Sequence, residues 1–153
     1  TATLIASCVA CGATAAGAEP DVVSRIHELG IQIGMAFQIK DDLFDYQSSG
    51  LIGKPTGNDI KEKKFTLPLI FALNQAESGR RKKMIKRIRN GNRSSVVVHE
   101  VIQFVKDQGG IRFAEEKMQE FKNRALDSLN GFPPSPARDA LKDLVEFTVS
   151  RNR

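Results

Sequence analysis

The sequence predicts an all-α domain. Apolar residues recur every three or four positions along most of the chain, which is the period of an amphipathic helix, and the sequence shows no alternating pattern typical of strands. The chain has nine Phe, one Tyr and no Trp, so its core must rest mainly on Leu, Ile, Val and Ala. With 153 residues, no internal repeat and no linker long enough to divide domains, we expect about six or seven helices around one core.

The first predicted helix covers residues 1–18, which carry no charge. Small residues dominate it, so we expect a buried helix that its neighbours approach closely. Cys8 and Cys11 form a CxxC pair, but no βαβ unit surrounds them and the sequence offers no matching zinc ligands, so both are interpreted as small buried residues. The segment fits neither a membrane span nor a signal peptide. Its uncharged start without Met leads us to expect a fragment of a longer protein.

The second predicted helix begins at Pro20, a residue favoured in a first turn, and stops near the sequence SSG at 48–50. Its apolar residues are spaced by threes and fours, which predicts one long and largely buried helix. The positions that define this spacing are Val23, Ile26, Leu29, Ile33, Phe37 and Phe44.

Five further helices are predicted. Thr66 and Pro68 begin the first of them, Gly79 closes it, and the run PPSP leads into the last. The five segments are 66–76, 80–93, 94–110, 111–132 and 137–152.

Residues 80–93 contain eight basic residues and no acidic residue, with Met84, Ile85 and Ile88 on one side. We interpret the segment as a solvated helix face that packs through these three apolar residues. Contact with an anionic lipid surface is an alternative. Nucleic acid is the weakest alternative, because no aromatic residues interleave for base stacking. The net charge of +5 is compatible with an anionic partner but does not specify its chemistry.

The end of the second predicted helix concentrates acidic side chains. Asp41 and Asp45 stand at i and i+4, and Gln38 lies one turn before Asp41 and Asp42 on the same face. Carboxylates repel one another there, and the negative end of the helix dipole repels them as well. A cation bound among them would remove this cost. A solvated acidic turn is the structural alternative. Interleaved apolar residues such as Phe37 predict instead that the acids line a cavity, and oxygen ligands without His or Cys indicate Mg²⁺.

The loop after this helix supplies groups suited to phosphate. Three glycines permit tight turns, and two lysines can direct positive charge at phosphate oxygens. These residues are Gly50, Gly53, Gly57, Lys54 and Lys64. The sequence lacks the Walker pattern GxxxxGK[ST], and the loop alone would be a weak signal. Together with the acidic turn it predicts a magnesium diphosphate ligand, because bound Mg²⁺ lets carboxylates hold a diphosphate that they would otherwise repel.

Three stretches carry a family resemblance. FQIKDDLFDY, GKPTGNDI and KKFTLPLI, in this order and spacing, closely resemble the second aspartate-rich region of the trans-isoprenyl diphosphate synthases, also called polyprenyl synthetases. The match is specific over about residues 30–72. It implies a helical bundle of the isoprenoid synthase type, with residues 1–153 as the C-terminal portion of a single polyprenyl synthetase domain.

The resemblance also implies roles for individual residues. The implied metal ligands are Asp41, Asp42, Asp45 and Asp59, with Asp41 in direct contact with Mg²⁺. The expected catalytic residues are Asp41, Asp42, Asp45, Lys54 and Lys64. The expected substrate-binding residues are Thr1, which looks like the threonine of the family's Lys-Thr pair, Gln38, Lys54 and Lys64, with Phe37 added for its place beside the acidic turn. Position 63 is Lys where many members carry Gly, a departure that we expect to be tolerated.

The implied activity is a Mg²⁺-dependent prenyl transfer that joins isopentenyl diphosphate head to tail to an allylic prenyl diphosphate. The resemblance further implies a homodimer, a cytoplasmic location and a long-chain product such as octaprenyl diphosphate. The family's first aspartate-rich motif is absent from this sequence, so residues 1–153 alone are expected to be inactive. Two alternatives stay open: a non-catalytic helical subunit that binds a partner, and a terpene cyclase, against which the acid-only turn argues.

Overall fold

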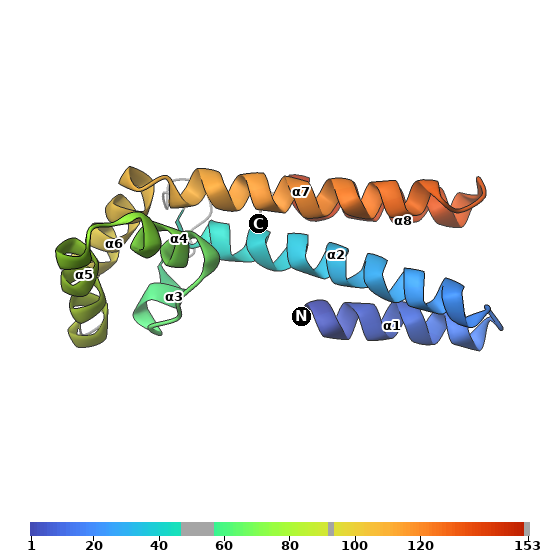
Figure 1. Ribbon diagram of the computed structural model, residues 1–153, viewed down its shortest axis with the longest axis horizontal. Helices are drawn as coiled ribbons and strands as arrows, with labels where there is room; N and C mark the ends of the chain where they lie inside the picture. Colours follow the sequence, from blue (N-terminus) through green and yellow to red (C-terminus); the bar gives the residue numbers. More distant parts are fainter. Residues whose placement is uncertain (47–56, 92–93, 152–153) are drawn as a thin grey trace. The chain divides into compact units, whose positions relative to one another are not determined.

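The computed structural model describes residues 1–46, 57–91 and 94–151, and every regular element in these ranges is a helix (Figure 1). The helices are α1 Ala2–Ala15, α2 Pro20–Phe44, α3 Asn58–Lys61, α4 Leu67–Gln75, α5 Ser78–Asn90, α6 Ser95–Asp107, α7 Gly110–Asn130 and α8 Pro136–Ser150. The predicted all-α class is confirmed. The described part of the chain holds one helix more than predicted, because α3 is a single four-residue turn and too short to show a period.

The chain divides into two compact units. The long-helix unit comprises Thr1–Lys40 and Glu116–Asn152, and the short-helix unit centres on Asp41–Glu115. In the long-helix unit, α1 and α2 run antiparallel, as do α7 and α8 (Figure 1). Its core joins α2, α7 and α8 through Leu29, Ile33, Ala125, Leu129 and Val145. The spacing of Leu29 and Ile33 was part of the predicted pattern of α2, and both are buried.

Helix α1 approaches α2 very closely along one side. A Cβ added to Gly34 would lie 2.4 Å from the Cα of Ala2, and one added to Gly30 would lie 2.5 Å from the Cα of Ala6. The predicted close approach of small residues is therefore confirmed.

The predicted burial of α1 is wrong for the described chain. Ala6 is its one buried residue, Leu4 is 68% exposed, and both cysteines are exposed rather than buried. The physical reason is that small side chains permit a close contact with α2 on one face, while the remaining faces of α1 meet solvent.

In the short-helix unit, one core is shared by α3, α4, α5 and α6. Its fully buried members include Leu69 of α4, Ile88 of α5 and Val101 of α6. Met84 and Ile85 pack against this core and are partly buried, so the prediction that α5 packs through its three apolar residues is confirmed. Gly79 does not close α4 as predicted, since α4 ends at Gln75 and Gly79 lies in the first turn of α5.

Helix α8 begins as predicted. Ser135 is its N-cap, and the Ser135 hydroxyl accepts a hydrogen bond of 3.2 Å from the backbone N–H of Arg138. Pro136 follows in the first turn, where a missing N–H costs nothing. Among the described helices, none combines the length and the apolar character that a membrane span requires.

Candidate functional site

The predicted acidic turn lies at the C-terminal end of α2. Asp41 and Asp42 belong to the last turn of the helix and are half-buried. Asp45 lies just beyond the end of α2, where its backbone N–H donates to the carbonyl of Asp42 at 3.3 Å. The first two aspartates of the motif are therefore helical, and the third follows the end of the helix at Phe44.

Asp45 connects the acidic turn to the loop that follows. Its carboxylate is buried, with 4% of the residue exposed, and accepts a hydrogen bond of 2.5 Å from the backbone N–H of Asp59. Its carbonyl accepts a second one, at 3.1 Å, from the N–H of Gly57. Gly57 has φ of 76°, and a Cβ there would lie 2.2 Å from a methyl group of Val98. Glycine is therefore required at position 57, and Asp45 fixes the start of α3.

Asp59 and Lys64 are in contact. The Lys64 ammonium lies 3.2 Å from a carboxylate oxygen of Asp59 and 2.8 Å from one of Glu62. The backbone N–H of Lys64 also donates to the carbonyl of Asp59 at 2.8 Å. Hydrogen bonds to Glu62 and then Asp59 raise the pKa of Lys64, so the side chain is held as a cation. The Lys64 side chain remains 60% exposed, which leaves its ammonium accessible to a ligand.

A buried hydroxyl pair holds the two ends of the motif region together. The hydroxyls of Tyr46 and Thr66 lie 2.7 Å apart, and both residues are buried. Burial raises the pKa of the Tyr46 phenol, and the nearby carboxylates of Asp45 and Asp42 add to the rise. Tyr46 directly follows the acidic motif and Thr66 precedes α4, so this contact joins the end of the motif to the start of α4. Neither residue was a predicted site residue.

Two predicted substrate-side residues meet in the long-helix unit. The Thr1 hydroxyl donates to the side-chain carbonyl of Gln38 at 2.8 Å. Phe37 is half-buried, and the guanidinium of Arg151 lies 4.0 Å from the centre of its ring. Arg151 was not a predicted site residue. Lys54 lies outside the described residues.

The described residues do not include a ready-made cluster of metal ligands. Within 1–46, 57–91 and 94–151, no group of three or more His, Cys, Asp or Glu side chains is gathered around a common point. One oxygen of Asp45 is used by the N–H of Asp59. Asp41, Asp42 and Asp59 are partly exposed, whereas Asp45 is buried.

Comparisons with known proteins agree with the family predicted from the sequence motifs. The family model for polyprenyl synthetase matches residues 1–105. The chain is 30% identical to octaprenyl diphosphate synthase of Escherichia coli, over all of this chain and 47% of that protein.

Solved structures share the fold, and two of them serve as examples. Geranylgeranyl pyrophosphate synthase from Bacteroides thetaiotaomicron superposes with a TM-score of 0.89 at 36% identity, over 99% of this chain and 50% of that one. A polyprenyl synthase from Caulobacter crescentus, complexed with calcium and isoprenyl diphosphate, superposes with a TM-score of 0.83 at 28% identity, over 97% of this chain and 45% of that one.

The chain spans less than half the length of the curated relatives it matches, with 36% and 47% as examples. The match nevertheless covers nearly all of this chain and includes the acidic turn, the glycine loop and the start of α4. The predicted family is confirmed, and with it the isoprenoid synthase fold. The chain belongs to the polyprenyl synthetase family.

Proposed function

We propose that this chain is part of a prenyltransferase that joins isopentenyl diphosphate head to tail to an allylic prenyl diphosphate. The observation that carries the proposal is the series of contacts from Asp45 through Asp59 to Lys64, which connects an exposed ammonium to the acidic turn within one unit. Carboxylates and an ammonium side by side suit a diphosphate that arrives with a metal ion. Membership of the polyprenyl synthetase family supports this ligand.

Mg²⁺ is the proposed cofactor, and the residues present fit it. Asp41 and Asp42 offer partly exposed carboxylate oxygens at the end of α2. Mg²⁺ is usually held by one or two carboxylates together with water and substrate phosphates, so its site need not gather three protein ligands beforehand. The Caulobacter relative supports a hard divalent cation, since it is described with calcium and isoprenyl diphosphate. When bound, such a cation supplies Lewis-acid polarisation of the diphosphate.

The side chains of this chain contribute binding and orientation. Asp45, through the N–H of Asp59, holds the start of α3 against the end of α2. Lys64 is oriented by Asp59 and Glu62 and donates hydrogen bonds to the leaving diphosphate, which stabilises negative charge as it develops. Lys54 is proposed as the second lysine for the same diphosphate, and Thr1 with Gln38 and Phe37 as further substrate contacts. No protein nucleophile is needed.

The product length remains a prediction. The Escherichia coli relative is an octaprenyl diphosphate synthase, in keeping with the predicted long-chain product, whereas the Bacteroides protein is a geranylgeranyl pyrophosphate synthase. The homodimer and the cytoplasmic location are likewise predictions.

The test is a comparison of Lys64→Gln with Lys63→Gln in a full-length protein that carries this chain. Lys63 is the matched control, because it is the exposed neighbour of Lys64 on the same turn. With isopentenyl and farnesyl diphosphates and Mg²⁺, we expect Lys64→Gln to raise KM for the allylic substrate or to lower kcat. Lys63→Gln should leave both constants unchanged, and neither variant should shift Tm by more than a degree or two.

Three outcomes contradict the proposal. A large fall in Tm for Lys64→Gln with unchanged kinetics would assign the residue a structural role. Cyclised hydrocarbon instead of a longer prenyl diphosphate would identify a terpene cyclase. No turnover by the parent protein, together with tight binding of a catalytic partner, would identify a non-catalytic subunit.

A further inference from the structure

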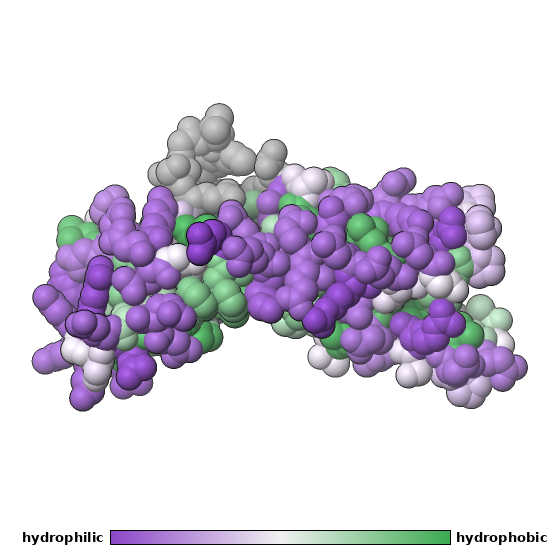
Figure 2. All heavy atoms as spheres, turned by 45° about the horizontal axis from the view of Figure 1, so that its top comes forward, coloured by the Kyte–Doolittle hydropathy of each residue, from purple (hydrophilic) through white to green (hydrophobic). Residues whose placement is uncertain are grey.

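Helix α5 carries an unusual concentration of positive charge. Between Ser78 and Asn90 it contains seven basic residues and no acidic one. The surface over α5, at the left of Figure 2, is largely hydrophilic. The basic residues are Arg80, Arg81, Lys82, Lys83, Lys86, Arg87 and Arg89.

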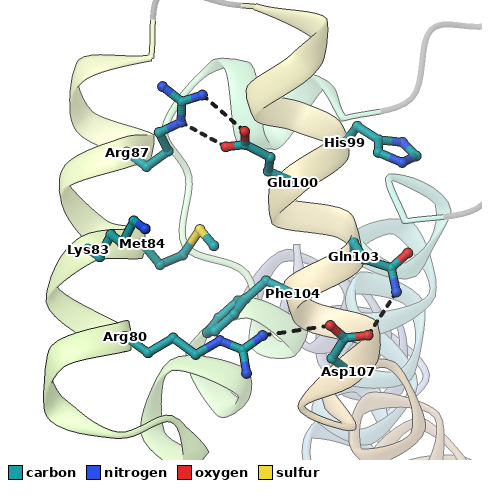
Figure 3. A pocket seen from close by; sticks show the side chains of 9 residues that line it. All are labelled: Arg80, Lys83, Met84, Arg87, His99, Glu100, Gln103, Phe104 and Asp107. Atoms are coloured by element: carbon teal, nitrogen blue, oxygen red, sulfur yellow. Dashed lines mark hydrogen bonds and ion pairs between the residues drawn. The ribbon is translucent and has the colours of Figure 1, made fainter.

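The packing of α5 onto α6 fixes which of its faces points outward. Ile88 is 1% exposed in the shared core, with Met84 and Ile85 packed beside it. Between α5 and α6 lies a pocket of about 680 Å³, and Figure 3 shows Met84 and Phe104 between two pairs of charged residues that link the helices.

These two pairs use the basic residues at the edge of α5 nearest α6. The Arg87 guanidinium donates two hydrogen bonds to Glu100, at 2.7 and 3.0 Å. Arg80 lies 3.7 Å from the carboxylate of Asp107 (Figure 3). The pairs neutralise that edge of α5 and hold the helix in register on α6.

On the side of α5 away from α6, the basic residues are not neutralised by acidic residues of α6. Lys82, Lys86 and Arg89 stand at i, i+4 and i+7, so they form one stripe along the helix. All three are exposed, and none forms an ion pair with any residue in the described part of the chain. Lys83 is exposed but lines the pocket on the side of Glu100, so it is not counted with them. We call Lys82, Lys86 and Arg89 the basic stripe.

We propose that the basic stripe docks the protein on the surface of an anionic phospholipid membrane. Charge complementarity carries the proposal, because several Lys and Arg side chains on one helix face gain binding energy together at a negatively charged bilayer. The stripe contains no aromatic or aliphatic side chain to insert between lipids, so the contact is electrostatic and superficial. It also lacks aromatic residues for base stacking, which disfavours nucleic acid. The proposal does not depend on the proposed function.

The experiment is co-sedimentation of the 153-residue protein with vesicles of phosphatidylcholine, with or without phosphatidylserine, at low and at physiological salt. We expect binding to the phosphatidylserine vesicles only, weakened by added salt. Lys82→Glu/Lys86→Glu should lower the partition coefficient about tenfold or more, since each basic residue contributes about a factor of five. Lys82→Arg/Lys86→Arg should bind like the parent protein.

The matched control is Lys106→Glu/Lys142→Glu, which makes the same change in net charge on α6 and α8. It should bind nearly as well as the parent, whereas an equal loss in both variants would show that net charge alone drives binding and would overturn the stripe. Absence of binding to phosphatidylserine vesicles would also overturn the proposal. So would binding to a random-sequence DNA duplex that is tighter than binding to vesicles and is lost in the same Lys82/Lys86 variant.

Discussion

Lys63 occupies a backbone conformation that favours glycine. Its φ is 59°, in the left-handed region, where a side chain costs about 1–2 kcal/mol. Glycine removes this cost, but it also lowers the free energy of unfolding by about 0.4–1 kcal/mol because it increases the conformational freedom of the unfolded chain. We therefore expect Lys63→Gly to raise the free energy of unfolding by about 0.5–1 kcal/mol, seen as a higher midpoint in urea. Lys at position 63, which we expected the fold to tolerate, therefore lowers the stability of the protein.

Lys61→Gly is the control for this change. Lys61 ends the helical turn α3, where glycine should destabilise by about 0.5–1 kcal/mol. If the two glycine variants changed stability in the same direction, the left-handed turn at Lys63 would not be the cause.

Asp41 and Asp45 are expected to separate catalysis from folding. Asp41→Ala removes one carboxylate from a group of like charges at the negative end of α2, so the fold should survive while turnover of a full-length protein falls by orders of magnitude. Asp45→Ala removes the buried acceptor for the N–H of Asp59 and should lower the free energy of unfolding by about 1–3 kcal/mol. Asp45→Asn keeps a carbonyl acceptor and should restore most of that stability.

Thermal unfolding and steady-state kinetics at saturating Mg²⁺ measure these effects on the same samples. Near-normal turnover of Asp41→Ala would remove Asp41 from the metal site. Equal stability of the Asp45 alanine and asparagine variants would show that the hydrogen bond to Asp59 does not hold the start of α3.

The sequence grouped several polar residues into one region but did not predict how the structure holds them. Asp59 and Lys64 were chosen from a motif, and they are in contact. The hydroxyl pair of Tyr46 and Thr66 was missed, because two residues 20 positions apart leave no periodic signal of their contact. Glu62 was missed for a similar reason: an acidic residue in a charged loop looks solvated until the turn at Lys63 brings it to Lys64.

At the scale of elements, the glycines of α2 determine how closely α1 packs. A Cβ at position 34 would meet the backbone of Ala2 at 2.4 Å, which a side-chain rotation cannot relieve. We expect Gly34→Ala to lower the free energy of unfolding by about 1–3 kcal/mol, as overpacking typically does. Gly12→Ala is the matched control, since nothing lies within 4 Å of its added Cβ, and it should stabilise α1 by about 0.5–1 kcal/mol. Chemical unfolding followed by far-UV circular dichroism compares them; a neutral Gly34→Ala would show that the two helices are free to separate.

Helical period predicted seven of the eight described helices, since each of those seven is long enough to repeat an apolar spacing. The four-residue α3 is held by Asp45 rather than by its own pattern, so only the structure reveals it. The predicted burial of α1 was wrong because composition shows that the residues are small but not how many faces of the helix contact other helices. Ala6 is buried while Cys8 and Cys11 are exposed on the same helix.

At the scale of the whole molecule, the chain carries one acidic motif and covers less than half the length of its relatives. Binding a diphosphate needs only one acidic turn with its lysines, whereas joining two prenyl substrates also needs a place for isopentenyl diphosphate and walls for the growing chain. We therefore expect residues 1–153 alone to give no product from isopentenyl and farnesyl diphosphates, even with excess Mg²⁺. A cooperative thermal transition of the same sample would show that it is folded. We expect the folded sample to bind inorganic pyrophosphate with Mg²⁺, more weakly after Lys64→Gln than after Lys63→Gln. Extraction of labelled prenyl product above the background of an Asp41→Ala control would contradict this expectation, because it would mean that these 153 residues suffice for both substrates.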